Sequence, residues 1–125
     1  MKKEINPSAL RFELSVFTET EKYHKHKIAA NLSILLTDGT KHLAEKAECY
    51  WLFDLIASYQ IKSSVREQQF QVWELKKGKD NGWVIKCTDG NGNKLVTQSI
   101  NFSDFPLDSI KIWLVNNIAM LPTEY

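Results

Sequence analysis

The 125-residue chain lacks most of the motifs that announce a reaction. It contains no phosphate-binding glycine loop, no nucleophile elbow, no His-Glu-x-x-His and no Cys-His pair at a familiar spacing. Its net charge is only +1, so there is no global field to recruit nucleic acid, an anionic membrane or an acidic substrate. These absences mean that no motif in the sequence identifies an enzyme class.

Cysteine and long apolar runs are also scarce. Cys49 and Cys87 match no zinc or redox spacing, and both are expected to be small buried residues in a reducing compartment. No run reaches membrane-spanning length. Residues 1–3 are basic, but Glu4 and Pro7 fall where a signal peptide needs an apolar core. We therefore expect a cytoplasmic protein without a cofactor, a metal ion or membrane contact.

What is present is typical of one globular domain over residues 1–125, with 43% hydrophobic and 25% charged residues. Asn6 can cap a short N-terminal helix, whose apolar stripe includes Leu10 and Leu14. A boundary at residues 37–40 precedes a second helical pattern, and we predict one long helix from about residue 40 to about residue 60, either straight or kinked near Glu48.

The core of that helix is the apolar run from Tyr50 to Ala57, which is hydrophobic on almost every side and is expected inside the protein. Asp54 lies in the middle of it. A buried acid must be paired, hydrogen-bonded or neutral, so Asp54 is either a structural acceptor or an acid-base group with a raised pKa. Helical spacing places Tyr50 and Ser58 on the same side as Asp54.

After residue 68 the hydrophobic period changes to two, which predicts strands near residues 70–75, 83–88 and 95–102 joined by glycine-containing turns. Residues 110–114 fit either a last helix or a fourth strand. Residues 31–36 could be a further strand, with residues 23–27 as a partner. The predicted fold class is α+β: a three- to four-stranded antiparallel meander packed on the long apolar central helix, with a short N-terminal helix.

The order and spacing of short motifs along the chain resemble those of an uncharacterised bacterial family of unknown function, whose members often belong to mobile elements and plasmids. The resemblance covers the chain from about residue 14 to its end, and the family's Phe-Thr-Gly-Thr motif has Glu19 here in place of the glycine. The resemblance implies candidate positions and no reaction. The matching residues are Phe17-Thr18, Thr20-Glu21, Tyr23, His26, Thr37-Asp38-Gly39, Leu43-Ala44, Tyr50-Trp51-Leu52, Asp54, Ile56, Ser58, Phe70, Val72-Trp73, Leu75, Cys87, Asp89-Gly90-Asn91, Gln98, Ile100, Asp104-Phe105-Pro106-Leu107, Leu121-Pro122 and Glu124-Tyr125.

Two functions remain open at this point. The first is a non-catalytic module that binds another protein through aromatic residues, with Tyr23, Tyr50, Trp51, Trp73 and Tyr125 as candidate contacts. The second is a small enzyme or ligand-binding domain, and its candidate site residues are Asp54, His26, Asp104 and Tyr23. The neutral charge argues against nucleic acid as the partner, while a homodimer through the outer side of the sheet is compatible with the pattern.

Overall fold

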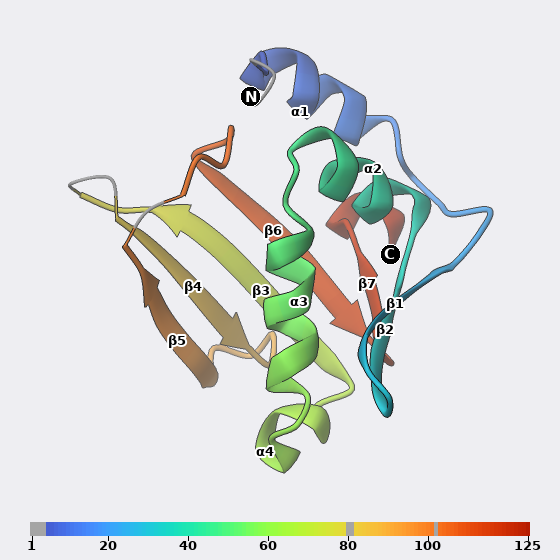
Figure 1. Ribbon diagram of the computed structural model, residues 1–125, viewed down its shortest axis with the longest axis vertical. Coiled ribbons are helices and arrows are strands. Elements are labelled where there is room, and N and C mark those ends of the chain that lie inside the picture. The colour runs from blue at the N-terminus through green and yellow to red at the C-terminus, as the bar shows by residue number, and fades with distance from the viewer. Residues whose placement is uncertain (1–4, 80–81, 102) are drawn as a thin grey trace.

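The computed structural model describes residues 5–79, 82–101 and 103–125. The basic start of the chain, the middle of the first predicted turn and Phe102 at the end of the third predicted strand therefore lie outside the described residues. Its elements, coloured along the chain in Figure 1, are α1 (Pro7–Ser15), β1 (His24–Ala29), β2 (Leu32–Leu36), α2 (Asp38–Lys46), α3 (Tyr50–Tyr59), α4 (Ser63–Arg66), β3 (Phe70–Lys77), β4 (Trp83–Thr88), β5 (Lys94–Ile100), β6 (Ser109–Val115), β7 (Ile118–Met120) and the 3₁₀ turn η1 (Pro122–Glu124).

Seven strands form one mixed sheet in the order β1-β2-β7-β6-β3-β4-β5. The β2–β7 pair is parallel, and the other neighbouring pairs are antiparallel. Asn116 and Asn117 both have positive φ, at 50° and 69°, as the tight turn from β6 to β7 requires. This short hairpin brings the end of the chain back to β2, so strands from both ends of the sequence lie side by side.

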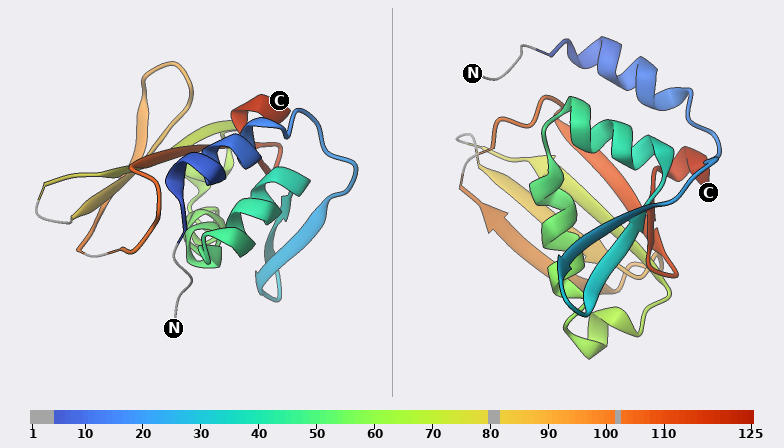
Figure 2. Two further views of the ribbon diagram at one scale, coloured as in Figure 1. Left: turned by 90° about the horizontal axis from the view of Figure 1, so that it is seen from above. Right: turned by 45° about the vertical axis from the view of Figure 1, so that its right-hand side comes forward.

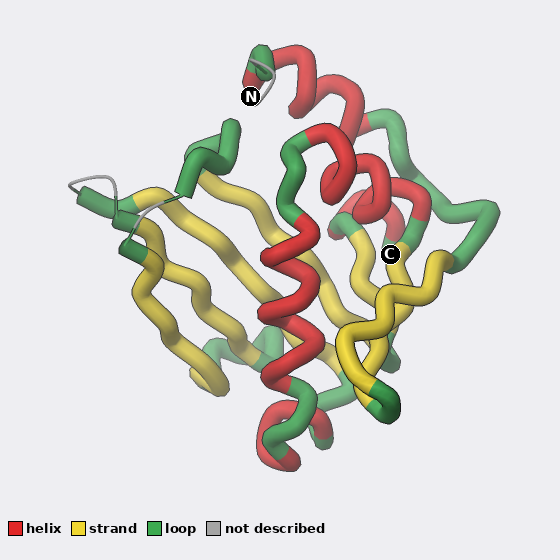
Figure 3. The backbone as a smooth tube through the Cα atoms, in the orientation of Figure 1, coloured by secondary structure: helices red, strands yellow, loops and turns green. Residues whose placement is uncertain are grey.

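The helices lie on one side of the sheet, and the sheet bends around them. Figure 2 shows β1 and β2 turned toward α3, and Figure 3 shows α3 running across the concave side of the strands. The α3 helix buries Phe53 and Ile56 in a core that also contains Trp73 and Ile112 of the central strands. The opposite face, called the outer face below, carries no α-helix within the described residues.

The predicted long central helix is wrong, because the chain breaks at Glu48. Glu48 has a φ of 50°, the Cys49 N–H donates to Ala44 O at 2.9 Å, and the Glu48 N–H donates to Glu45 O at 3.4 Å. These two bonds form a Schellman motif, in which a left-handed residue ends a helix and satisfies its last carbonyls. Glycine usually occupies that position, so the glutamate indicated at most a kink, whereas the structure has a complete break between α2 and α3.

The predicted architecture of a three- to four-stranded meander is also wrong. The strands β3, β4 and β5 are consecutive and antiparallel, but they form only one side of the seven-stranded sheet. Residues 110–114, which fitted either a helix or a strand, lie in strand β6, paired with β3 along seven positions. The short N-terminal helix is present as α1, and the Asn6 side chain accepts from the Ala9 N–H at its start.

Candidate functional site

Two of the predicted site residues, His26 and Asp54, meet between β1 and α3. Alternate residues of β1 face the helices, which points His24 and His26 inward and Lys25 and Lys27 outward. The His26 Nε2 lies 2.6 Å from Asp54 Oδ1, and the His26 ring stacks on Tyr50 with centroids 5.7 Å apart. The carboxylate can therefore fix the orientation of the imidazole.

Asp54 is not the buried acid that the sequence predicted. Its side chain is 55% exposed, while that of His26 is 16% exposed. The α3 helix is amphipathic in its contacts: Leu52, Phe53, Ile56 and Ala57 enter the core, whereas Asp54 lies on the solvent side. Burial, followed by the nearby Glu45 carboxylate and Cys49, raises the pKa of Tyr50. Asp54 is therefore not a carboxyl group held in an apolar interior, and the prediction of a buried acid on this helix was wrong.

Trp51 lies between two shallow hollows beside this pair. One hollow is lined by Asp54 and Ser58 together with Lys27, Ile28 and Leu55. The other brings Trp51 together with Asp104, Ile100 and Ser103. Four predicted positions of α3 and its surroundings, Tyr50, Trp51, Asp54 and Asp104, are thus near one another on the surface.

The remaining predicted residues lie elsewhere. Tyr23 is exposed just before β1, and Trp73 is buried in the core, where its Nε1–H donates to Gln71 Oε1 at 3.0 Å. Tyr125 lies on the outer face of the sheet, away from α3. The predicted set therefore divides into a surface cluster on α3, a core tryptophan and a residue of the outer face.

Two further histidines also pair with carboxylates. His24 Nε2 lies 2.8 Å from Asp38 Oδ1, and His42 Nε2 lies 2.8 Å from Glu13 Oε1. The hydrogen bond with His24, followed by one from the Glu21 N–H, lowers the pKa of Asp38. Across the described ranges, no group of three or more histidine, cysteine or acidic side chains is arranged to hold a metal ion. No helix within those ranges is long and apolar enough to cross a membrane.

The outer face of the sheet carries a band of half-buried apolar side chains over which no α-helix packs within the described residues, and we call it the apolar band. By strand register its members fall in two neighbouring cross-strand rows over β2, β7, β6 and β3. All of these strand positions are only partly buried. The first row contains Leu35, Ile118, Val115 and Phe70, and the second contains Met120, Trp113 and Val72.

Aromatic contacts concentrate at one end of this band. Phe70 lies 5.1 Å from Trp113 between ring centroids, and Tyr125 meets both rings edge-on at 5.9 and 5.3 Å. The Tyr125 side chain nevertheless remains 73% exposed. In these contacts the positive edge of one ring approaches the negative face of another, which is the arrangement that aromatic quadrupoles favour.

Lysines surround the apolar band. Several described strand residues on the outer face are exposed lysines, and Glu74 is an acidic residue on the same face. The lysines include Lys25, Lys27, Lys76, Lys86 and Lys111. A hollow of about 390 Å³ between α1 and η1 borders the band and is lined by Arg11, Lys111 and Glu74. Positive side chains therefore outnumber negative ones among these outward strand positions.

The C-terminal segment is held in place by Glu124. Its carboxylate accepts from Thr37 Oγ1 at 2.6 Å, from the Gly39 N–H at 3.0 Å and from the Leu121 N–H at 2.9 Å. Gly39 lies in the first turn of α2, where the helix dipole favours a negative group. This contact positions Tyr125 beside the band.

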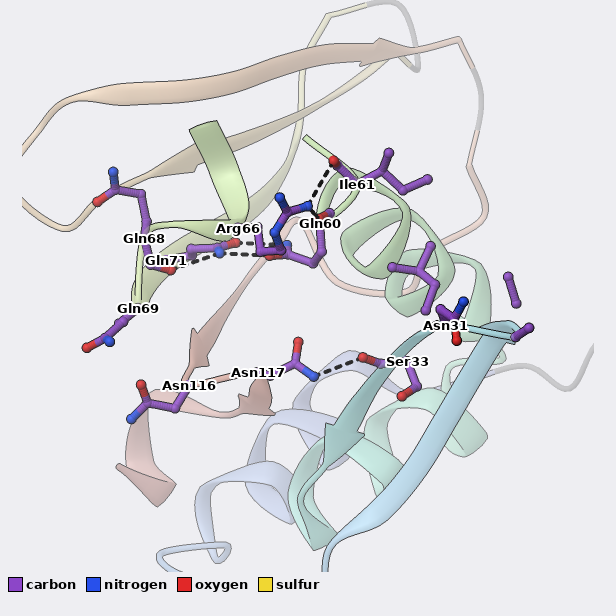
Figure 4. Close-up of a pocket in the computed structure, with 13 residues that line it drawn as sticks. Asn31, Ser33, Gln60, Ile61, Arg66, Gln68, Gln69, Gln71, Asn116 and Asn117 are labelled. Atoms are coloured by element: carbon purple, nitrogen blue, oxygen red, sulfur yellow. Dashed lines mark hydrogen bonds between the residues drawn. The ribbon is translucent and has the colours of Figure 1, made fainter. Parts of the chain in front are cut away.

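A second cavity, which the sequence did not reveal, lies at the other end of the sheet. Figure 4 shows this cavity of about 800 Å³ between the β1–β2 turn, the α3–α4 segment and the β6–β7 turn. Seven side-chain amides line it, and we call it the amide pocket. A signal was available in the glutamine cluster at residues 68–71 and the Asn-Asn pair at residues 116–117, but only the sheet topology brings the two together. The amides are Asn31, Gln60, Gln68, Gln69, Gln71, Asn116 and Asn117.

The fold and these surfaces define a small α+β domain with one face of its sheet open. The chain belongs to a family of unknown function (DUF6876), whose sequence model matches residues 8–125. No curated protein and no solved structure matches the chain. The resemblance inferred from the sequence is thus confirmed at the level of the family.

Proposed function

We propose that this protein is a non-catalytic module that binds another protein through the apolar band of its outer face. The observation that supports the proposal is the half-buried double row of aliphatic and aromatic side chains across four strands. Exposed apolar patches of this kind, bordered by polar residues, are typical of interaction surfaces. The bacterial and cytoplasmic setting of the proposal depends on the family resemblance and on composition.

The charges around the band indicate the chemistry of the surface that the proposed partner would present. Lys25 lies opposite Leu35 of the band, and Lys111 lies two residues before Trp113, with Arg11 at the margin, so the complementary surface is an apolar segment flanked by carboxylates. An amphipathic helix with an acidic polar side has this chemistry. The lysines would increase the association rate, while burial of the central side chains would provide most of the affinity.

Single-stranded nucleic acid fits the band less well. Most of its strand positions are aliphatic, and aliphatic side chains do not provide the ring faces on which bases stack. The three aromatic rings, Phe70, Trp113 and Tyr125, are engaged with one another. The same lysines are compatible with either partner, so the proposal of a protein partner rests on the aliphatic character of the rows.

A second candidate function follows from the His26–Asp54 pair. A histidine oriented by a carboxylate is the arrangement of a general base, and the neighbouring hollow with Trp51 and Ser58 could receive a small ligand. Asp104 lies at the adjoining hollow, while Tyr23 is exposed before β1. Within the described residues, no serine or threonine hydroxyl is hydrogen-bonded to His26, so a nucleophile would have to come from the substrate or water.

The test compares partner capture by variants of the two surfaces. The tagged protein is cross-linked in a lysate of its host, and a captured protein is then purified and titrated directly. Tyr125→Ala and Lys25→Glu/Lys111→Glu should each weaken its binding at least tenfold. The control Lys46→Glu changes an exposed lysine of α2 away from the band and should leave binding unchanged.

The outcomes separate the possible occupants. A direct complex that weakens with rising salt and with the band variants supports the proposal. Concentration-dependent dimerisation abolished by Tyr125→Ala would assign the band to a second copy and overturn it. Nucleic acid in the eluate, or a partner insensitive to all band variants, would also overturn it. Asp54→Asn serves as the matched variant for the second candidate, because it removes the histidine's partner without altering the outer face.

A further inference from the structure

The amide pocket exists because the β6–β7 hairpin is short. Strand β2 begins at Leu32 but meets β7 only at Leu35 and Leu36. The Leu35 N–H donates to Asn117 O at 3.0 Å, and Ser33 O accepts from Asn117 Nδ2 at 2.9 Å. Because successive residues of a strand direct their main-chain N–H groups to opposite edges, Ser33, two residues before Leu35, points its N–H to this same side, where the hairpin has ended. The beginning of β2 is therefore a strand edge that borders a pocket.

The floor of the pocket is a rigid and fully satisfied amide network. Gln60 and Gln71 are 6% and 2% exposed and exchange two hydrogen bonds, of 3.0 and 2.9 Å. Gln60 also donates to Ile56 O, and Gln71 also donates to Val65 O and Gln68 O. Such a network holds its shape before a ligand arrives, which reduces the entropy lost on binding.

The rim has the opposite character, because its polar groups are unused. The side-chain amides of Asn31, Gln68, Gln69 and Asn116 line the pocket and have no hydrogen-bond partner among the described residues. Each of these amides presents a donor and an acceptor, which match the C=O and N–H of a peptide group. The rim and the edge of β2 can therefore satisfy an extended main chain.

Arg66 is the one charged side chain in the lining. Its Nη1 donates to Gln60 O and Ile61 O, both at 3.1 Å, at the end of α3. These two bonds hold the guanidinium in place and leave its Nε and Nη2 donors without a protein acceptor in the described part of the chain. The free side of a guanidinium matches a carboxylate through two parallel hydrogen bonds.

The composition of the lining disfavours two other kinds of ligand. It contains no carboxylate, so a cation or an amine has no counter-charge, and it contains no aromatic ring on which a base or a sugar could stack. Ala29, Ala30, Leu32 and the 67% exposed Ile61 form an apolar side of the pocket. We propose that the amide pocket binds the carboxyl-terminal end of an extended peptide, with the carboxylate at Arg66 and an apolar last side chain against Ile61.

This site is separate from the apolar band and does not depend on the function proposed for it. The main chain of the peptide lies along the edge of β2 and adds hydrogen bonds there, as in strand addition to an open sheet edge. The volume of about 800 Å³ lies in the range of pockets that enclose drug-sized ligands. The peptide end can come from the tail of another protein or from a free peptide.

The test titrates the ¹⁵N-labelled protein with the synthetic peptide N-acetyl-Ala-Ala-Ala-Leu and follows the side-chain NH₂ signals by NMR. The signals of Asn31, Gln69 and Asn116 should shift, and those of the outer face should not. The same peptide with a C-terminal amide should bind about tenfold more weakly, because it loses the charge-assisted pair with Arg66. The peptide without its acetyl group mimics a free peptide, and tighter binding of that form would identify the second source.

Two variants complete the design. Gln69→Ala removes a rim amide that makes no protein contact and should weaken binding severalfold, whereas Asn101→Ala removes an exposed amide outside the pocket and should not. Equal binding of the acid and amide peptides overturns the assignment of Arg66 to a carboxylate. An absence of shifts at millimolar peptide, or shifts unaffected by Gln69→Ala, overturns the pocket as a peptide site.

Discussion

Replacing Glu124 with glutamine tests whether the end of the chain stabilises the domain. In the native protein the carboxylate accepts three hydrogen bonds, from Thr37, Gly39 and Leu121, at the start of α2. The glutamine carbonyl can retain the bonds made by one oxygen, but its NH₂ group then faces the buried Gly39 N–H, which loses its acceptor. An unsatisfied buried donor costs about 1–3 kcal/mol. Loss of the negative charge beside the helix N-terminus costs a further ~0.3–1 kcal/mol.

The expected decrease in the free energy of unfolding for Glu124→Gln is therefore about 2 kcal/mol. For a domain of this size that corresponds to a fall in Tm of about 5–10 °C. Urea unfolding followed by tryptophan fluorescence measures the first quantity, and calorimetry measures the second. Glu67→Gln changes an exposed glutamate after α4 and should alter stability by less than about 0.5 kcal/mol. Equal stabilities of Glu124→Gln and the native protein would refute the reasoning.

A double-mutant cycle with Gly39 examines the same contact from the other side. A Cβ atom on Gly39 would lie 2.5 Å from Glu124 Oε1 and 2.8 Å from Leu121 Cδ1, so Gly39→Ala must displace the carboxylate. Its cost should be clearly smaller in a Glu124→Ala background, because the main obstacle is gone and alanine is the better helix residue. Additive effects of the two substitutions would show that Glu124 does not occupy the position described.

Three further predictions concern the core and the surface pairs. In urea unfolding, Trp73→Phe should lower the free energy of unfolding by about 1–2 kcal/mol more than Trp83→Phe does. Trp73 donates a hydrogen bond to buried Gln71, whereas the buried Trp83 Nε1–H has no partner among the described residues. The reverse order of the two losses would contradict this reasoning. The hydrogen bonds to Asp38 hold its pKa below the ordinary value of 3.8, so its contribution to stability is present above about pH 4 and is lost as the pH falls through the lowered value. Stability curves of Asp38→Asn and the native protein should converge in acid, and a difference independent of pH would exclude this linkage. Asp54→Asn should cost less than about 1 kcal/mol, because the Asp54 side chain is 55% exposed. A loss near 3 kcal/mol would mean that Asp54 is buried in solution.

Sequence reasoning located best those helices and strands whose signal comes from residues close together in the chain. The Asn6 cap and the alternation in residues 83–88 depend on neighbours in the chain, and both elements lie where the pattern predicts. Sequence reasoning allowed a kink near Glu48 but not the complete break, because Glu48 adopts a left-handed conformation that is unusual for glutamate. The exposed position of Asp54 was missed because a short apolar helix can bury one face and still present an acid to solvent.

The candidate surfaces were predicted only in part. Sequence reasoning selected His26 and Asp54 independently, but whether they share a site depends on how β1 crosses α3. It included Tyr125 among the binding candidates but not its aromatic neighbours Phe70 and Trp113, which reach it through the register of β3 and β6. The amide pocket lay outside the prediction altogether, since its lining comes from three turns distant in sequence.

By itself, the sequence determined the family, the near-neutral charge and the helices and strands whose hydrophobic period and caps act over a few residues. The tertiary structure alone decided the seven-stranded sheet, the open outer face and the amide pocket. The physical reason is that strand order results from hydrogen bonds between segments far apart in the chain. The parallel pairing of β2 with β7 joins residues 35–36 to residues 118–119, and no local pattern encodes that contact.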